Sequence, residues 1–267
     1  NPRVHGAVSH RPRKRFGQHF LHDPGVIARI VAAIAPRPGD RLVEIGPGRG
    51  ALTVPLLERA GRLEAVELDR DVIPLLEAAA AGHGELTVHQ ADALDFDFAG
   101  LADGAAPLRL VGNLPYNIST PLLFHLLAAA GAVTDMHFML QKEVVTRMAA
   151  APGGKDYGRL TVMLAAACRV ERLFDIGPGA FTPPPRVRSA FVRLEPWPSS
   201  PFPALDPDRY ALIVRTAFSK RRKTLRNALR GVLEADEIAA AGCDPGARPE
   251  TLAPADFARL SVVSTGR

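Results

Sequence analysis

The residues best suited to chemistry in this chain form one short turn, Asn113-Leu114-Pro115-Tyr116. The side chain of Asn113 and the carbonyl of Leu114 can accept hydrogen bonds, and the ring of Tyr116 offers an apolar face. The exocyclic amine of an extruded adenine needs two acceptors for its hydrogens, and its ring needs an aromatic surface. The turn therefore indicates amine methylation of a base, although such a tetrapeptide also occurs by chance in unrelated loops.

A glycine-rich loop lies upstream of this turn. Residues 42–45 are typical of a buried strand, and Gly46, Gly48 and Gly50 follow before a helix that we expect over residues 51–59. Glycine lets the chain turn tightly and lets a ligand approach the backbone, as in nucleotide-binding loops. The Gly-x-Gly-x-Gly spacing departs from the dinucleotide fingerprint, so nothing here requires a pyrophosphate.

Acidic residues follow the next two predicted strands. Glu67 lies near the end of a strand over residues 63–69, where nucleotide-binding folds place the acid that binds ribose hydroxyls. Asp92 follows a strand over residues 86–90, where its carboxylate could accept from an adenine amine. Either acid alone would be a solvated loop residue or a helix cap. Beside a glycine loop they indicate one site, because ligands of open α/β sheets bind outside the carboxyl ends of the strands.

These segments together resemble the S-adenosylmethionine-dependent rRNA adenine dimethyltransferases, and most closely the enzymes that act on the bacterial small subunit. The matching segments are residues 15–21, 46–53, 67–69, 91–93, 113–120, 138–144, 180–187 and 221–227. One position departs from the family pattern, since the family usually has Asn where this chain has His19. Histidine can still donate or accept one hydrogen bond there.

The resemblance implies a Rossmann-like α/β methyltransferase fold, with a seven-stranded, mostly parallel sheet and a small all-helical C-terminal domain. It implies S-adenosylmethionine as methyl donor and S-adenosylhomocysteine as product. The expected catalytic residues are Asn113, Leu114, Pro115, Tyr116 and Phe181. Phe181 is either a second aromatic wall for the base or ordinary core packing. The expected cofactor ligands are Gln18, His19, Leu21, Gly46, Gly48, Glu67, Leu68, Asp92, Ala93 and Asn113.

For methyl transfer the enzyme mainly has to place the nucleophile in line with the methyl group, because the sulfonium of the donor is already a good electrophile. The difficulty is the adenine N6 lone pair, which is delocalised into the ring. Acceptance of both N6 hydrogens by Asn113 and the Leu114 carbonyl would favour a more tetrahedral nitrogen. No strong general base is needed, since the methylated cation loses its proton readily. A second methylation of the same nitrogen requires room as well as acceptors.

The order of elements supports an α/β fold. Strand-like and helix-like blocks alternate over residues 41–141, which predicts a parallel sheet covered by helices. Asp23-Pro24 and Thr120-Pro121 are typical helix starts. Residues 168–176 and 189–195 predict an antiparallel pair at the sheet edge.

A Pro-rich, aperiodic stretch over residues 195–207 indicates a stiff linker. We therefore expect a flexible basic arm at 1–15, a methyltransferase domain at 16–198 and a helical domain at 199–267, with helices over 209–218 and 223–235.

The charge pattern favours RNA as partner. The net charge is +5, and basic residues gather in two clusters. One is the N-terminal arm with Arg11, Arg13, Lys14 and Arg15, and the other is the C-terminal cluster with Lys220, Arg221, Arg222, Lys223 and Arg226. Phosphate contacts from such clusters would position RNA, while shape and the extruded base would supply selectivity. The alternative for each cluster is a solvated face.

Several classes of protein are disfavoured by the sequence. The two cysteines, Cys168 and Cys243, have no metal-like spacing, so we expect no metal site and a reduced, cytoplasmic protein. No stretch approaches the roughly 20 apolar residues of a membrane span. We also expect a monomer.

The resemblance implies dimethylation of two adjacent adenines in the 3′-terminal hairpin loop of 16S rRNA, within the immature 30S subunit, and a role in subunit biogenesis. Three alternatives remain open. A large-subunit resistance methyltransferase is disfavoured by Leu114 and the 182–185 loop, and a DNA amine methyltransferase by Leu114, where that class commonly has Pro. The third is a binding factor for subunit assembly or mitochondrial transcription. Intact Gly46, Glu67, Asp92 and Asn113 weigh against loss of catalysis, although both roles can coexist.

Overall fold

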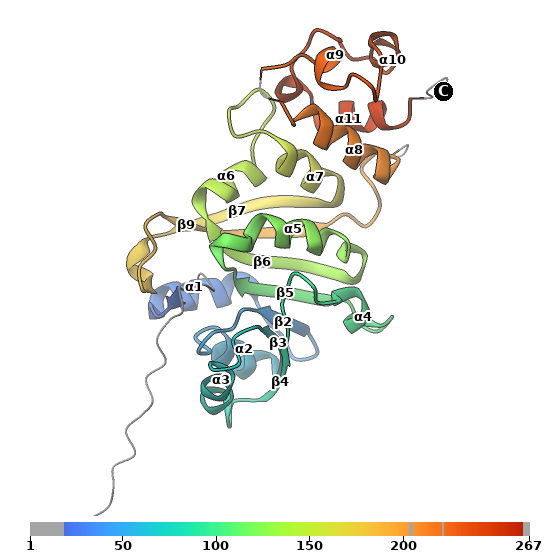
Figure 1. Cartoon of the computed structure of the whole chain (residues 1–267). Coiled ribbons are helices and arrows are strands. Elements are labelled where there is room, and N and C mark those ends of the chain that lie inside the picture. The colour runs from blue at the N-terminus through green and yellow to red at the C-terminus, as the bar shows by residue number, and fades with distance from the viewer. Residues whose placement is uncertain (1–18, 203–204, 221, 264–267) are drawn as a thin grey trace, which may run out of the picture. The chain divides into compact units, whose positions relative to one another are not determined.

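The computed structural model describes residues 19–202, 205–220 and 222–263 of the 267 (Figure 1). The chain divides into two compact units. The first takes the chain up to Lys142 together with Leu173–Val192, and the second takes Glu143–Arg172 together with the chain from Arg193. The expected basic arm over residues 1–15 lies outside the described residues.

A seven-stranded sheet with strand order β4-β3-β2-β5-β6-β9-β7 confirms the expected fold class (Figure 1). The five strands from β4 to β6 in this order pair in parallel. The strands are β2 (Arg41–Ile45), β3 (Arg62–Glu67), β4 (Glu85–Gln90), β5 (Leu108–Asn113), β6 (Val133–Gln141), β7 (Cys168–Ile176) and β9 (Ser189–Pro196). The expected edge strands are the neighbours β7 and β9.

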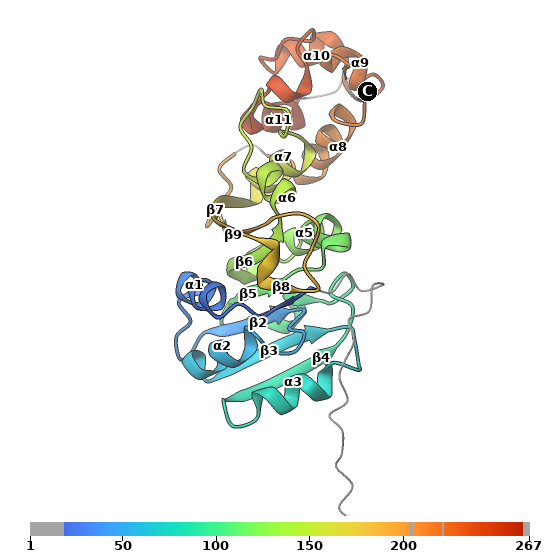
Figure 2. The ribbon, with the colours of Figure 1, turned by 90° about the vertical axis from the view of Figure 1, so that its left-hand side faces the viewer.

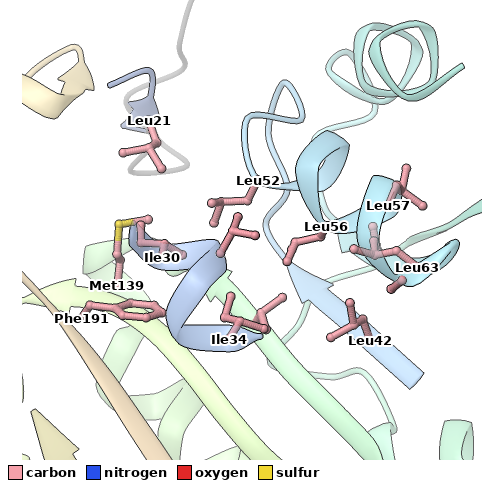
Figure 3. Packing of buried hydrophobic residues seen from close by; sticks show 14 of the residues in the cluster. Leu21, Ile30, Ile34, Leu42, Leu52, Leu56, Leu57, Leu63, Met139 and Phe191 are labelled. Atoms are coloured by element: carbon pink, nitrogen blue, oxygen red, sulfur yellow. The ribbon is translucent and has the colours of Figure 1, made fainter. Parts of the chain in front are cut away.

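Apolar residues on both sides of the central strands explain this parallel sheet. Val43 of β2 and Leu110 of β5 are fully buried, as expected for strands covered on both faces. Figure 3 shows Ile30 and Ile34 packing in the same apolar cluster as Leu42. Each such side chain contributes roughly 1.5–3 kcal/mol of burial free energy. The core therefore holds the carboxyl ends of the strands in fixed positions.

Helices connect the strands of the first unit. They are α1 (Pro24–Ile34), α2 (Thr53–Ala60), α3 (Ile73–Ala80), α4 (Phe98–Ala102) and α5 (Ser119–Leu127). Figure 2 shows α2 and α3 beside β3 and β4, against which they pack. Short 3₁₀ turns occupy Tyr116–Ile118, Ala130–Ala132, Pro178–Ala180 and, in the second unit, Pro249–Thr251.

One predicted helix start is confirmed and the other is wrong. Asp23 caps α1, since its carboxylate accepts from the backbone N–H of Gly25 at 2.9 Å, with Pro24 at the first helical position. The helix after the Asn113 turn begins at Ser119, so Thr120 lies within it and does not cap it. Ser119 instead donates its hydroxyl to the carbonyl of Tyr116 at 2.9 Å. This bond ties the turn to α5.

A second, two-stranded sheet was not predicted by the sequence. Strand β1 (Phe20–Leu21) pairs antiparallel with β8 (Phe181–Thr182). Two-residue strands carry no hydrophobic periodicity, and only the tertiary fold brings them together. The pair brings the residues around His19 next to the Pro-rich loop that follows β8.

The second unit is mostly helical and also holds parts of β7 and β9. Its helices are α6 (Lys142–Met148), of which Lys142 belongs to the first unit, α7 (Arg159–Ala167), α8 (Pro207–Ala217), α9 (Leu225–Ala228), α10 (Ala235–Ala240) and α11 (Pro254–Ser261). Its boundaries differ from the expected division at 198/199. Tyr157 and Val162 are buried in the same apolar cluster as Tyr210, whose hydroxyl donates to the carbonyl of Val162 at 2.6 Å. Residues 143–172 therefore belong with the C-terminal helices.

The single helix expected over residues 223–235 is wrong. Helix α9 ends after Ala228, and α10 begins only at Ala235. Between them Gly231 adopts φ 88°, a left-handed conformation that glycine tolerates and that interrupts a helix.

Among the described residues, no helix is long and apolar enough to cross a membrane.

Candidate active site

A cavity at the carboxyl ends of the parallel strands brings the predicted site residues together. The ends of β2, β3 and β5, the loop after β4, and the β1 segment line it. The predicted residues in its wall are His19, Leu21, Gly46, Gly48, Glu67, Leu68, Asp92, Ala93, Asn113, Leu114, Pro115 and Tyr116. Gln18 lies outside the described residues. The glycine loop, the acids and the Asn113 turn thus share one cavity.

The glycine loop needs glycine for two reasons. Gly46 and Gly48 have φ values of 66° and 57°, in the left-handed region that other residues avoid. A Cβ at Gly48 would lie 3.0 Å from the ring of Phe20, and one at Gly46 would lie 3.5 Å from the carbonyl oxygen of Asn113. The left-handed backbone thus favours glycine at both positions, and at Gly48 a Cβ would also press on the ring of Phe20.

Glu67 is held in a fixed orientation by the backbone. It is 7% exposed, and its Oε1 accepts from the N–H of Gly48 at 3.2 Å while its Oε2 accepts from the N–H of Asp69 at 3.0 Å. Burial raises the pKa of Glu67, and the two backbone hydrogen bonds partly oppose that shift. Because a carboxylate oxygen has more than one lone pair, both oxygens can also accept from a ligand hydroxyl.

Asp92 and Leu68 complete the wall on the side of β3 and β4. Asp92 uses Oδ1 to accept from the N–H of Leu94 at 3.0 Å, which fixes the carboxylate at the cavity. Leu68 is 47% exposed, an unusual exposure for leucine beside a buried strand. An exposed apolar side chain next to fixed carboxylates suits a flat heteroaromatic ligand with polar edges.

Glu44 is a site residue that the sequence analysis missed. It is 1% exposed, lines the cavity and accepts from the Thr53 hydroxyl at 2.5 Å. The pKa of Glu44 is raised to about 7, chiefly by burial; the Thr53 bond opposes this shift, and the nearby Glu67 adds to it. The signal was present in the sequence, since Glu44 interrupts an apolar strand. An acid in such a place marks a buried polar function.

The orientation of the Asn113 amide follows from one hydrogen bond. Its Nδ2 donates to the backbone carbonyl of His19 at 2.8 Å. Since only the NH₂ end of an amide can donate to a carbonyl, the Oδ1 of Asn113 remains the acceptor available to a ligand. The N–H of Leu114 donates to the carbonyl of Met139 on β6 at 3.2 Å, which anchors the turn to the sheet.

Tyr116 presents a ring and keeps its hydroxyl occupied. The hydroxyl forms a short hydrogen bond with the hydroxyl of Ser189. Burial raises the pKa of Tyr116, so the phenol stays neutral. The ring centroid lies 5.3 Å from that of His19, with 30° between the planes. His19 in turn donates from Nδ1 to the carbonyl of Pro183 at 2.8 Å, because a carbonyl can only accept.

Phe181 lies in the core. It is 2% exposed, packs with Leu21 and Phe191, and is not part of the cavity wall. Of the two interpretations open for Phe181, this position corresponds to core packing. The aromatic neighbour of Tyr116 in the wall is His19, at the position where the chain departs from the family pattern.

The C-terminal basic cluster is only partly described. Lys220 and Arg222 line a second cavity, of about 520 Å³, in the helical unit. Arg147, Arg159 and Arg248 line the same cavity, and no sequence spacing connects them. Lys223 and Arg226 are exposed beside it in sequence, whereas Arg221 and the predicted arm residues Arg13, Lys14 and Arg15 lie outside the described residues.

A family model described as ribosomal RNA adenine dimethylase matches residues 9–264. The chain belongs to the ribosomal RNA adenine dimethylase family. The resemblance inferred from the motifs is therefore confirmed, and so is the assignment to the rRNA adenine dimethyltransferases.

Curated relatives of this dimethylase match it over nearly the whole chain. It is 58% identical to ribosomal RNA small subunit methyltransferase A of Pseudomonas aeruginosa over 252 residues, and the match covers 94% of each chain. It is 55% identical over 260 residues to the protein of the same name from Marinobacter nauticus, covering 97% of this chain and 94% of that one.

Solved structures confirm the methyltransferase fold of the dimethylase. A dimethyladenosine transferase from Plasmodium falciparum matches with a TM-score of 0.77 and 27% identity, covering 91% of this chain and 96% of that one. The 23S rRNA methyltransferase ErmE matches with a TM-score of 0.70 and 27% identity, covering 91% and 98%.

Proposed function

We propose that this dimethylase transfers methyl groups from S-adenosylmethionine to N6 of two adjacent adenines in the 3′-terminal hairpin loop of 16S rRNA, within an immature 30S subunit. The observation that carries the proposal is the single cavity shared by the glycine loop, Glu67 and the Asn113 turn. The small-subunit names of relatives at 55–58% identity support the choice of substrate.

The cofactor end of the cavity fits an adenosyl group. Gly46 and Gly48 lie in the cavity wall and have no side chain, so a ligand can lie directly against their backbone. Glu67, fixed through both oxygens, would accept from ribose hydroxyls, and Asp92 would accept from the adenine amine. The exposed Leu68 would pack on the adenine face. Bound S-adenosylmethionine supplies an electrophilic methyl group, and the chain supplies its placement.

The target end of the cavity fits the adenine to be methylated. Oδ1 of Asn113 and the Leu114 carbonyl accept the two N6 hydrogens, which favours a more tetrahedral nitrogen with its lone pair toward the methyl group. The bond from Asn113 to the His19 carbonyl keeps Oδ1 in this role. Tyr116 stacks on the base, and its bond to Ser189 prevents ring rotation. The methylated nitrogen passes its proton to a carbonyl or to water.

RNA outside the pocket is held by basic side chains. Lys220 and Arg222, together with Arg147, Arg159 and Arg248, place positive charge around one cavity of the helical unit. The exposed Lys223 and Arg226 extend this charge. Such contacts position an RNA by its phosphates and leave base choice to the pocket. We propose that a single copy of the chain acts in the cytoplasm on this substrate.

Transfer of labelled methyl groups to undermethylated small subunits tests the proposal, with large subunits, protein-free rRNA and DNA in parallel. Formation of N6,N6-dimethyladenosine in small subunits alone, mapped to the two hairpin adenines, is the expected result. Label in large subunits or DNA would contradict the proposed substrate. Tight subunit binding without label would instead favour an assembly factor.

A further inference from the structure

Three consecutive exposed residues stand beside the target end of the cavity and have no assigned role. Arg186, Val187 and Arg188 are exposed, with Val187 at 46%, and they lie between the buried Pro185 and Ser189. Arg186 and Val187 belong to the 180–187 segment that resembles the family, Arg188 lies just beyond it, and none of the three had an expected function. The segment therefore presents one apolar side chain between two cations to solvent.

The segment is tied to the target end of the pocket at both of its ends. Ser189 bonds the hydroxyl of Tyr116, the residue proposed to stack on the target base. The carbonyl of Arg188 accepts from the N–H of Lys142 at 2.9 Å, and the Pro183 carbonyl accepts from His19 at 2.8 Å. The backbone on both sides of the three exposed residues is thus fixed relative to Tyr116.

The charges of the two arginines are not paired by any of the residues that the structure describes. Within residues 19–202, 205–220 and 222–263, neither the Arg186 nor the Arg188 side chain forms a hydrogen bond or an ion pair. Arg109, by contrast, is bonded to both Asp40 and Asp135 at 2.8 and 2.9 Å. Two cations flanking an apolar residue at the rim of a base pocket match a single RNA strand, whose phosphates alternate with apolar sugar and base faces.

We infer that Arg186, Val187 and Arg188 form the binding site for the RNA strand that flanks the target adenine. The two guanidinium groups bind the phosphates on either side, and Val187 packs against the neighbouring nucleotide while the target base enters the cavity. The inference rests on the proposed function for its substrate, and it adds the residues that hold the strand at the pocket.

The test measures the salt dependence of binding to a fluorescent single-stranded RNA with two adjacent adenines. Each phosphate contact on a single strand contributes about 0.7 units to the log-log slope. Arg186→Ala with Arg188→Ala should therefore lower the slope by about 1.4 units, which corresponds to about 25-fold in affinity over a tenfold change in salt. Arg186→Lys with Arg188→Lys should restore the slope, because lysine retains the charge.

A matched pair of exposed arginines serves as control. Arg37 and Arg59 lie in the same unit, near the amino ends of β2 and β3 and so at the opposite end of the sheet from the cavity. Arg37→Ala with Arg59→Ala removes the same charge and should leave the slope unchanged. Equal slopes for the two pairs of variants would overturn the inference.

Val187 is tested separately on the undermethylated subunit. Val187→Ala should raise KM about 4- to 15-fold, as expected for the loss of one to two buried methyl groups, and Val187→Ile should not. An unchanged KM for Val187→Ala would remove this residue from the site. Since RNA binding is measured without methyl transfer, a failure of the proposed function would show as absent methylation by the wild-type protein, whatever the slopes.

Discussion

The buried carboxyl of Glu44 makes the stability of this dimethylase depend on pH between about 4.5 and 7. Glu44 is 1% exposed beside Thr53 and the second buried acid Glu67, and its pKa is raised from 4.5 to about 7. Replacement by Gln keeps an oxygen that can accept from Thr53 and removes the titration. The amide also buries an NH₂ group, whose cost of about 1–3 kcal/mol does not vary with pH.

The size of the effect follows from the shift. A difference of about 2.5 pKa units between the folded and unfolded chain, at about 1.4 kcal/mol per unit, gives about 3 kcal/mol. The raised pKa of Glu44 destabilises the folded protein at neutral pH. Between pH 4.5 and 7 the folded protein retains the Glu44 proton and the unfolded chain has lost it, so the free energy of unfolding falls as pH rises and levels off above pH 7.

Urea unfolding of the cofactor-free protein measures this directly, with wild type and Glu44→Gln compared from pH 5 to 8 at constant ionic strength. The wild type should lose about 2–3 kcal/mol relative to the variant across this range, most of it below pH 7. Glu67 has a raised pKa with the same sign, but it titrates in both proteins and largely cancels in the difference. Parallel pH profiles for the two proteins would refute the reasoning.

Three further predictions concern the cavity and the C-terminal basic cluster. Gly48→Ala should lower the affinity for S-adenosylmethionine at least about tenfold in calorimetry, since its Cβ would lie 3.0 Å from Phe20 at φ 57°. Gly39→Ala, with φ 92° and open space around its Cβ, should leave that affinity unchanged. An equal loss of affinity in both variants would show that the glycine loop has no specific role in cofactor binding. Tyr116→Phe should retain methyl transfer within a few-fold, because the ring remains, whereas Tyr116→Ala should raise KM for subunits about 10- to 100-fold; similar values for both would assign the role to the hydroxyl. Arg222→Ala should flatten the salt dependence of subunit binding by about one unit, and Arg59→Ala should not. An unchanged slope for Arg222→Ala would show that the C-terminal basic cluster is a solvated face that does not bind RNA.

Much of the pocket could be predicted from the sequence because its residues occupy strand ends. Glu67 and Asp92 are recognisable only together with the glycine loop, and the parallel sheet places all three at one edge. Glu44 could have been found as the one acid in an apolar strand. The orientation of the Asn113 amide could not, because it depends on a bond to a residue 94 positions away.

The features of the fold that the sequence does not predict have equally specific causes. The pairing of β1 with β8 joins two-residue strands far apart in the chain, for which no local pattern exists. The prediction of one helix over 223–235 followed the apolar periodicity and did not consider Gly231, whose left-handed conformation interrupts a helix. The unit boundary depends on Tyr157 and Val162, whose burial with C-terminal helices is a tertiary property.

The central claim is that one cavity combines a cofactor site with an amine-accepting turn, and Asn113→Ala separates the two. We would measure S-adenosylmethionine affinity by calorimetry and single-turnover methyl transfer to undermethylated small subunits for the wild type and for Asn113→Ala. The account predicts that Asn113→Ala slows transfer about 100-fold or more while cofactor affinity changes by less than about threefold. Unchanged transfer, or a loss of transfer matched by an equal loss of cofactor affinity, would contradict it.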